Sequence, residues 1–164
     1  MKLESLTLNN FRQFYEQQTI KFSRDNSKNV TIIEGVNGAG KTTLLTSIIW
    51  CLYGHPLDNV GEIINKRKLL EKADSKEAYV QLKFSHHGER YSALRSIKTT
   101  NRKGDTYTNS SANNSEYSFS LTKIRSNGQC EEVVNPSATI ESIIPTAVNP
   151  YFFFDGEKID QFAK

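Results

Sequence analysis

The residue types most suited to chemistry lie between Gly35 and Thr42, which read G-x-x-x-x-G-K-[ST], with Thr43 directly behind. The glycines let successive backbone N–H groups turn toward one anion, and a following helix adds the positive end of its dipole. The Lys41 ammonium suits the β- and γ-phosphates of a nucleoside triphosphate, the Thr42 hydroxyl suits Mg²⁺, and the Thr43 hydroxyl suits the α-phosphate. The pattern predicts binding of ATP with Mg²⁺. The residues expected to hold the nucleotide are Asn37, Gly38, Ala39, Gly40, Lys41, Thr42 and Thr43.

Arg12 is a further candidate, because it follows Asn10-Phe11 where the first predicted strand ends. It either reaches the phosphates of the nucleotide or is an exposed arginine of a hairpin. The run Tyr151 to Glu157 places four aromatic residues before two carboxylates that flank a glycine. An acid at the carboxyl end of a strand is well placed to meet a ligand, so Asp155 is a candidate ligand of Mg²⁺. The alternative is a core strand that ends in a solvated turn. Lys41 and Asp155 are the residues expected to take part in catalysis.

The glycine-rich loop needs a strand before it and a helix after it. Residues 30–34 are mostly apolar and β-branched, which predicts a short strand that is buried on both faces. Residues 42–53 place leucine and isoleucine at helical spacing, and Gly54 with Pro56 ends that helix. The predicted order is therefore strand, phosphate loop, helix.

Most of the remaining chain alternates between apolar and polar residues, which predicts an appended antiparallel sheet. Expected strands cover 3–9, 17–23, 79–84, 90–97, 117–124, 131–134 and 151–154, with 3–9 at a sheet edge. Short helices are expected around 62–72 and at 138–144, and a further helix starts at 158. Residues 99–115, rich in Asn, Thr, Ser and Gly, predict an exposed flexible loop.

With 164 residues the chain is long enough for one domain with a core, and no stretch is apolar enough to cross a bilayer. Cys51 and Cys130 lack metal-ligand spacing, and Cys51 is expected to be a buried thiol, so we expect a cytoplasmic protein. The net charge of +3 does not by itself indicate a nucleic-acid partner. The basic runs 66–68 and 102–103 are either solvated surface or contacts to a phosphate backbone.

Three motifs together resemble the N-terminal half of SMC/SbcC/RecF-type ATPase heads, within the ABC ATPase class. They are Leu6-Thr7-Leu8-Asn9-Asn10-Phe11-Arg12, the loop Gly35 to Thr43, and Leu52-Tyr53-Gly54. Within that class, the tail from Phe152 to Ile159 looks most like DndD, the ATPase of bacterial DNA phosphorothioation and its linked defence systems. The resemblance covers essentially the whole chain.

The resemblance implies an α/β fold: a P-loop NTPase of the ABC/SMC type, with a strand–P-loop–helix core and an appended antiparallel β-sheet. It implies that Arg12 approaches the phosphates. In such heads a Q-loop glutamine binds Mg²⁺ and the attacking water. Asp155 stands where that glutamine is expected, so either Asp155 or Gln161 takes the role.

The family's second lobe carries the Walker B aspartate, the catalytic glutamate and a signature serine loop, and the sequence holds no corresponding motif and no coiled-coil heptads. Residues 1–164 are therefore expected to form one incomplete domain, from a truncated chain, a gene fragment or one half of a split protein. A second ATPase lobe or head, in homodimer-like engagement, and DNA are the expected partners, with no membrane.

The expected function is Mg-ATP binding by the N-terminal lobe of an SMC-like ATPase in DNA metabolism, DNA modification or phage defence. One alternative is a nucleotide-gated interaction module without turnover, because the sequence lacks an evident general base. Another is a P-loop nucleotide kinase or GTPase, although the chain has no Asn-Lys-x-Asp guanine motif and two strands precede the strand that leads into the loop.

Overall fold

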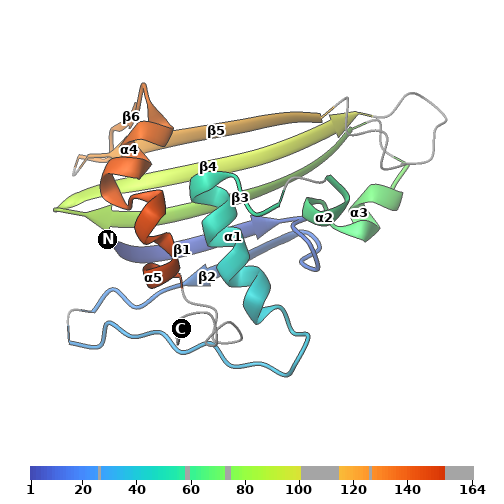
Figure 1. Cartoon of the computed structure of the whole chain (residues 1–164), viewed down its shortest axis with the longest axis horizontal. Coiled ribbons are helices and arrows are strands. Elements are labelled where there is room, and N and C mark those ends of the chain that lie inside the picture. The colour runs from blue at the N-terminus through green and yellow to red at the C-terminus, as the bar shows by residue number, and fades with distance from the viewer. Residues whose placement is uncertain (26, 58–59, 73–74, 101–114, 126, 154–164) are drawn as a thin grey trace.

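A computed structural model of the chain describes residues 1–25, 27–57, 60–72, 75–100, 115–125 and 127–153 (Figure 1). The strands are β1 (Lys2–Asn9), β2 (Gln17–Lys21), β3 (Ser75–His86), β4 (Glu89–Thr100), β5 (Ser115–Ile124) and β6 (Cys130–Glu132). The helices are α1 (Lys41–Tyr53), α2 (Val60–Ile63), α3 (Lys66–Leu70), α4 (Pro136–Ile143) and α5 (Asn149–Phe152), with a 3₁₀ turn, η2 (Thr146–Val148), before α5. None of the described helices is both long and apolar enough to cross a membrane.

The strands form one six-stranded antiparallel sheet in the order β2-β1-β3-β4-β5-β6. The predicted hairpins are confirmed: β1 pairs with β2, and β3 pairs with β4 across the His87-Gly88 turn. The prediction that the first strand lies at an edge is wrong. Strand β3, more than sixty residues away in the chain, pairs along the side of β1 that β2 leaves open, so β2 is the edge.

The helices α1, α4 and α5 lie on one face of the sheet, and the core fills the space between (Figure 1). Alternate residues of β3, from Ala78 to Phe84, are fully buried there because successive side chains of a strand point to opposite faces. Helix α1 contributes Trp50, Cys51 and Leu52, and full burial of one large apolar side chain stabilises the fold by about 1.5–3 kcal/mol. The molecule is therefore an α/β fold with its phosphate-loop helix packed on an antiparallel sheet.

The prediction that Cys51 is a buried thiol is confirmed. Its Sγ lies 3.4 Å from the carbonyl oxygen of Val80 and 3.6 Å from that of Ala93. Burial raises the pKa of the Cys51 thiol to about 12, so the reactive thiolate is absent at neutral pH.

The carboxyl end of α1 is fixed by Arg95 of β4. The Arg95 Nε donates to the carbonyl oxygen of Cys51 at 3.0 Å, and Nη2 donates to that of Leu52 at 3.3 Å. The guanidinium also lies over the Phe119 ring, 4.2 Å from its centroid. A cation is favourable at this end of a helix because the last carbonyl groups are unpaired and carry the negative end of the dipole. Gly54 ends the helix at φ 81°, and its N–H donates to the Trp50 carbonyl at 2.8 Å, as the sequence predicted.

Two predicted strands are not formed. Residues 30–34 adopt no strand and are exposed. A strand needs a neighbouring strand for its backbone hydrogen bonds, and no described strand pairs with this run. The aromatic run from Tyr151 begins inside α5, where Pro150 near the helix start favours a helix.

The expected loop 99–115 is shorter at both ends, because β4 runs to Thr100 and β5 begins at Ser115. Residues 101–114 lie outside the described residues.

We expect Gly54→Ala to destabilise the protein more than Gly88→Ala. Both glycines have φ 81°, so an added Cβ costs roughly 1–2 kcal/mol at either position. At Gly54 that Cβ would also lie 3.1 Å from Arg95 Nη1, whereas at Gly88 it would meet no atom within 4 Å. Disturbing the Arg95 hydrogen bonds adds about 1 kcal/mol. Urea unfolding of both variants measures the difference, and equal losses would contradict the role of Arg95 as a cap.

Candidate functional site

The phosphate loop runs directly into α1, as predicted. Gly38 and Gly40 have φ 81° and 102°, a backbone region that residues with a Cβ rarely adopt. The turn is closed by the Ala39 N–H, which donates to the Val36 carbonyl at 3.1 Å, and the helix begins when the Leu44 N–H donates to the Gly40 carbonyl at 3.0 Å. No side chain caps the first turn of α1, so its N–H groups face the loop.

A cavity of about 240 Å³ lies at this helix start. Its lining brings together most of the residues that the sequence predicts to hold the nucleotide: Asn37, Gly38, Gly40, Lys41, Thr42 and Thr43, but not Ala39. The cavity therefore combines backbone N–H groups, one ammonium group and two hydroxyl groups. Such a set binds phosphate oxygens.

Lys41 is folded back over the loop. Its Nζ donates to the carbonyl oxygens of Gly35 at 2.6 Å and Val36 at 3.0 Å. These carbonyl groups are neutral dipoles, so an anion in the cavity would attract the ammonium more strongly than they do. The Thr42 side chain is exposed at the same helix start, where its hydroxyl is a hard oxygen ligand of the kind that Mg²⁺ prefers.

Thr43 is buried and pairs with a residue that the sequence analysis missed. Its Oγ1 donates to the Oε1 of Gln13 at 2.8 Å. Gln13 also lies over the loop, since a Cβ added to Gly40 would come within 2.6 Å of the Gln13 Nε2. The only signal in the sequence is that Gln13 directly follows Arg12, because contact with the loop depends on how the chain folds back.

The backbone of Arg12 is held in a strained conformation, with φ 52°. Its N–H donates to the Ile63 carbonyl at 2.7 Å, and its own carbonyl accepts from Asn65 Nδ2 at 2.6 Å. The Arg12 side chain lines a second cavity of about 580 Å³ between this turn and the segment that contains α2. Gln13 lines both cavities, so the two adjoin at that residue.

Two buried asparagines hold the turn in place. Asn10 donates through Nδ2 to the Glu77 carbonyl at 3.3 Å, and its Oδ1 accepts from the Glu16 N–H at 2.9 Å. The Asn65 N–H donates to the Asn10 carbonyl at 2.7 Å, while the Asn65 side chain caps α3 by accepting from the Arg67 N–H at 2.9 Å. The turn that carries Arg12 and the start of α3 are therefore one hydrogen-bonded unit.

Two side chains of the basic run 66–68 pair with neighbouring side chains of the protein. The Arg67 guanidinium lies 4.1 Å from the centroid of the Tyr15 ring. The Lys68 Nζ lies 2.6 Å from Glu71 Oε2, a pairing that raises the pKa of Lys68 and lowers that of Glu71. Lys66 lines the cavity of about 580 Å³. The expected contact between this run and a phosphate backbone stays a prediction.

The carboxylate and amide candidates of the tail, Asp155, Glu157 and Gln161, lie outside the described residues, as does the basic run 102–103. Within the described part of the chain, no group of three or more His, Cys, Asp or Glu side chains could hold a metal ion. Thr42 is thus the one predicted metal ligand that the described residues place at the cavity.

Comparison with known proteins adds family information. The sequence profile of the AAA_23 family, described as an AAA domain, matches residues 5–164. The SbcC component of the nuclease SbcCD from Treponema pallidum is 33% identical over 100 residues, 61% of this chain and 9% of that protein. The DNA replication and repair protein RecF from Clostridium acetobutylicum is 38% identical over 85 residues, 52% of this chain and 21% of that protein.

Two further matches are more distant. The DNA double-strand break repair Rad50 ATPase from Sulfolobus acidocaldarius is 29% identical over 102 residues, 62% of this chain and 10% of that protein. The SMC head domain from Thermotoga maritima matches with a TM-score of 0.41 and 25% identity, over 80% of this chain and 39% of that chain. The matched region thus spans between 9% and 21% of the length of the curated relatives. SbcC and RecF are two of the proteins that the resemblance named.

Proposed function

Since this chain belongs to the AAA_23 family of AAA domains, we propose that it binds Mg-ATP as the N-terminal lobe of an SMC-like ATPase head. The observation that carries the proposal is the cavity of about 240 Å³, in which backbone N–H groups, Lys41, Thr42 and Thr43 meet at the start of α1. A helix start that combines these groups favours a polyphosphate because each supplies a donor or a positive charge.

The phosphates enter this cavity and draw the Lys41 Nζ away from the carbonyl groups of Gly35 and Val36. The ammonium then lies against the β- and γ-phosphates, and the Thr43 hydroxyl turns toward the α-phosphate. A magnesium ion held by Thr42, with Asp155 or Gln161 as the further ligand, would supply charge neutralisation. The residues of this lobe position the triphosphate and compensate its charge, which is the protein's main task in phosphoryl transfer.

The nucleoside extends from the phosphates into the adjoining cavity of about 580 Å³. Arg12 lines that cavity beside Gln13, which also borders the phosphate cavity. Arg12 is partly buried next to Gln13, which supports the proposal that it reaches the phosphates at the border of the two cavities rather than the alternative of an exposed hairpin arginine. The two cavities together give room for a whole nucleotide.

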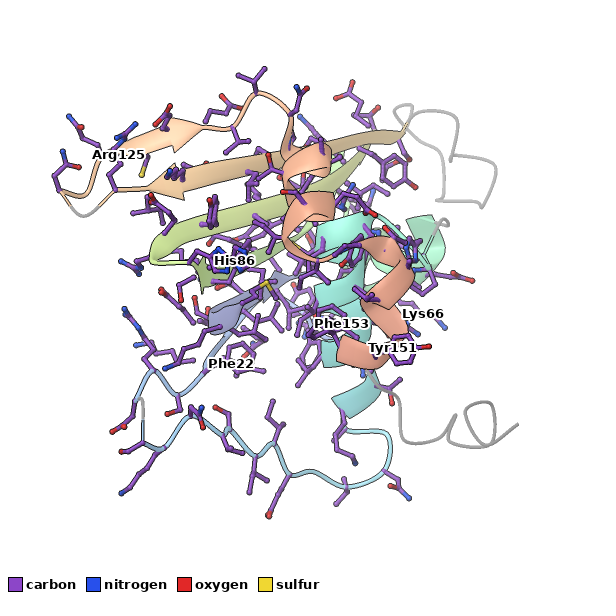
Figure 2. All side chains as sticks on the ribbon, turned by 60° about the vertical axis from the view of Figure 1, so that its left-hand side comes forward. Phe22, Lys66, His86, Arg125, Tyr151 and Phe153 are labelled. Atoms are coloured by element: carbon purple, nitrogen blue, oxygen red, sulfur yellow. The ribbon has the colours of Figure 1, made fainter. Side chains whose placement is uncertain are left out.

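A second ATPase lobe or head covers the segment 30–36. Val30, Ile32 and Val36 are 74%, 79% and 80% exposed, and the segment runs outside the sheet in both views (Figures 1 and 2). Beside it lies an apolar cavity of about 210 Å³ lined by Leu6, Phe22, Ile33, Leu44, Leu45 and Ile48, with the Lys41 stem. β-Branched residues in an extended run are suited to a sheet, and a strand from a second lobe would bury them next to the phosphate loop.

The relatives are named for a nuclease, for DNA replication and repair, and for double-strand break repair. We infer that the whole protein acts in DNA metabolism, with DNA as its partner, in the cytoplasm. Both Cys51 and Cys130 are free thiols, which fits a reducing compartment. The finer assignment, to the DndD-like branch and so to DNA modification and phage defence, is supported by the sequence from Phe152 to Ile159.

We expect Lys41→Ala to weaken ATP binding in the presence of Mg²⁺ by roughly ten- to a hundredfold, because charge-assisted hydrogen bonds contribute about 1.5–3 kcal/mol. Calorimetry on the purified chain measures it, with the exposed Lys98→Ala as the matched control. Unchanged affinity in Lys41→Ala would refute the proposal. Turnover, measured on the same samples, separates an ATPase from a nucleotide-gated module that binds without hydrolysis.

We expect Ile32→Asp to lower the ATP turnover of the full-length protein at least about tenfold, because the second lobe would bury an unpaired charge. The unfolding midpoint of the 164-residue chain should not change, since Ile32 is 79% exposed there. Val134→Asp, at a residue that is 91% exposed and remote in sequence from the phosphate loop, is the control. Equal turnover in the two full-length variants would contradict a second lobe on this segment.

If the chain belongs to the DndD-like branch, deletion of its gene in the source organism should remove phosphorothioate linkages from genomic DNA or the phage protection linked to them. Mass spectrometry of digested DNA and phage plating measure the two effects. A deletion strain that keeps both at the level of its parent would rule out this branch, while leaving the proposed ATP binding untouched.

A further inference from the structure

The amide of Gln13 lies directly on the phosphate loop. Its Oε1 accepts a hydrogen bond from Thr43 Oγ1 at 2.8 Å. Its Nε2 lies beside Gly40, so close that a Cβ added to Gly40 would come within 2.6 Å of it. Gln13 belongs to the turn after β1, whereas Thr43 and Gly40 belong to the start of α1. One exposed side chain therefore links two elements that meet only in the folded protein.

The position of Gln13 is set by the backbone on both sides of it. Arg12 is held by hydrogen bonds to Ile63 and Asn65, and the Phe14 N–H donates to the Phe11 carbonyl at 2.9 Å. A side chain that starts from such a fixed turn loses little further conformational freedom when it contacts a ligand, so its contacts are made at low entropic cost.

Gln13 also lines both cavities of the site, and it is the one residue that the two described linings share. The cavity of about 240 Å³ contains the phosphate-binding groups, and the cavity of about 580 Å³ has room for the nucleoside. A nucleotide that occupies both must pass Gln13 where its α-phosphate joins the sugar. Thr43, the partner of Gln13, is the residue assigned to that α-phosphate.

The chemistry of the amide suits a sugar at this point. A glutamine side chain offers a carbonyl acceptor and two N–H donors. The carbonyl faces Thr43, which leaves the amino group beside the loop to face the next group along the nucleotide. A ribose hydroxyl can accept from that amino group. When the Thr43 hydroxyl turns to the α-phosphate, the Gln13 carbonyl becomes able to accept from a ribose hydroxyl as well.

We propose that Gln13 is a specificity-determining residue that binds a ribose hydroxyl of the nucleotide. The assignment rests on the proposed ATP binding and adds to it the reason for selecting a nucleoside triphosphate over a bare polyphosphate. Lys41 and the loop bind phosphate in either ligand, whereas Gln13 contributes only when a sugar with hydroxyl groups is present.

The test measures the binding of three ligands, each with Mg²⁺, by calorimetry: ATP, 2′,3′-dideoxy-ATP and inorganic tripolyphosphate. Gln13→Met keeps the length of the side chain but removes its hydrogen-bonding groups. This variant should bind ATP roughly three- to tenfold more weakly than the wild type, the effect of one or two neutral hydrogen bonds. Its affinities for dideoxy-ATP and tripolyphosphate should equal those of the wild type.

Gln13→Ala removes the side chain over Gly40 and so avoids any poor fit of methionine at this position. This variant should also bind ATP more weakly and should keep the wild-type affinities for dideoxy-ATP and tripolyphosphate. Gln18→Met, at an exposed residue of β2, is the matched control and should leave all three affinities unchanged. Lys41→Ala should weaken all three ligands together. That contrast distinguishes a ribose contact from a general disturbance of the phosphate loop.

Equal losses for all three ligands in both Gln13 variants would overturn the assignment, because Gln13 would then support the loop rather than read the sugar. Unchanged ATP affinity in both variants would overturn it too, while leaving the proposed function intact. If the wild type bound none of the three ligands, the proposed function would fail and the role of Gln13 with it.

Discussion

The packing of α1 across the antiparallel sheet is the interaction on which the rest of the structure depends. Ile48 buries the middle of the helix in the core, and Trp50, Cys51 and Leu52 bury its last turn. Arg95, which lies over the Phe119 ring, holds the carboxyl end through two carbonyl groups. The same helix carries the phosphate loop at its other end. Because a helix is stiff along its axis, anchoring the carboxyl end and the middle also fixes where Lys41, Thr42 and Thr43 lie.

A second constraint brings the turn after β1 to that helix start. Buried backbone groups must find hydrogen-bond partners, and Asn10 and Asn65 satisfy several of them at once. Their network ties the turn to α3 and leaves Arg12 and Gln13 facing the cavities. The strained φ of Arg12 is kept because the surrounding hydrogen bonds outweigh its cost. The candidate site is thus assembled from three segments that are distant in sequence.

By contrast, the described sheet does not bury the segment before the phosphate loop, residues 30–34. Its residues favour a sheet, but the six strands of this sheet leave it without a described partner, and its side chains remain exposed. The aromatic run that was also expected to form a strand divides between core and surface: Phe153 packs against the core, whereas Tyr151 is 77% exposed (Figure 2). A local sequence that agrees with a strand, with no described strand to pair with, is the observation that motivates the proposed second lobe at this segment.

The sequence by itself determined the phosphate loop, the helix that follows it and most of the antiparallel strands, because each depends on local spacing: glycines that allow positive φ, apolar residues at helical intervals, and alternation along strands. It also indicated the buried thiol of Cys51. Only the tertiary structure decided that β1 is an inner strand, that residues 30–34 pair with no described strand, and that Gln13 meets Thr43. Strand order and contacts between remote segments depend on which surfaces bury one another and where backbone groups find partners, and no local pattern encodes these.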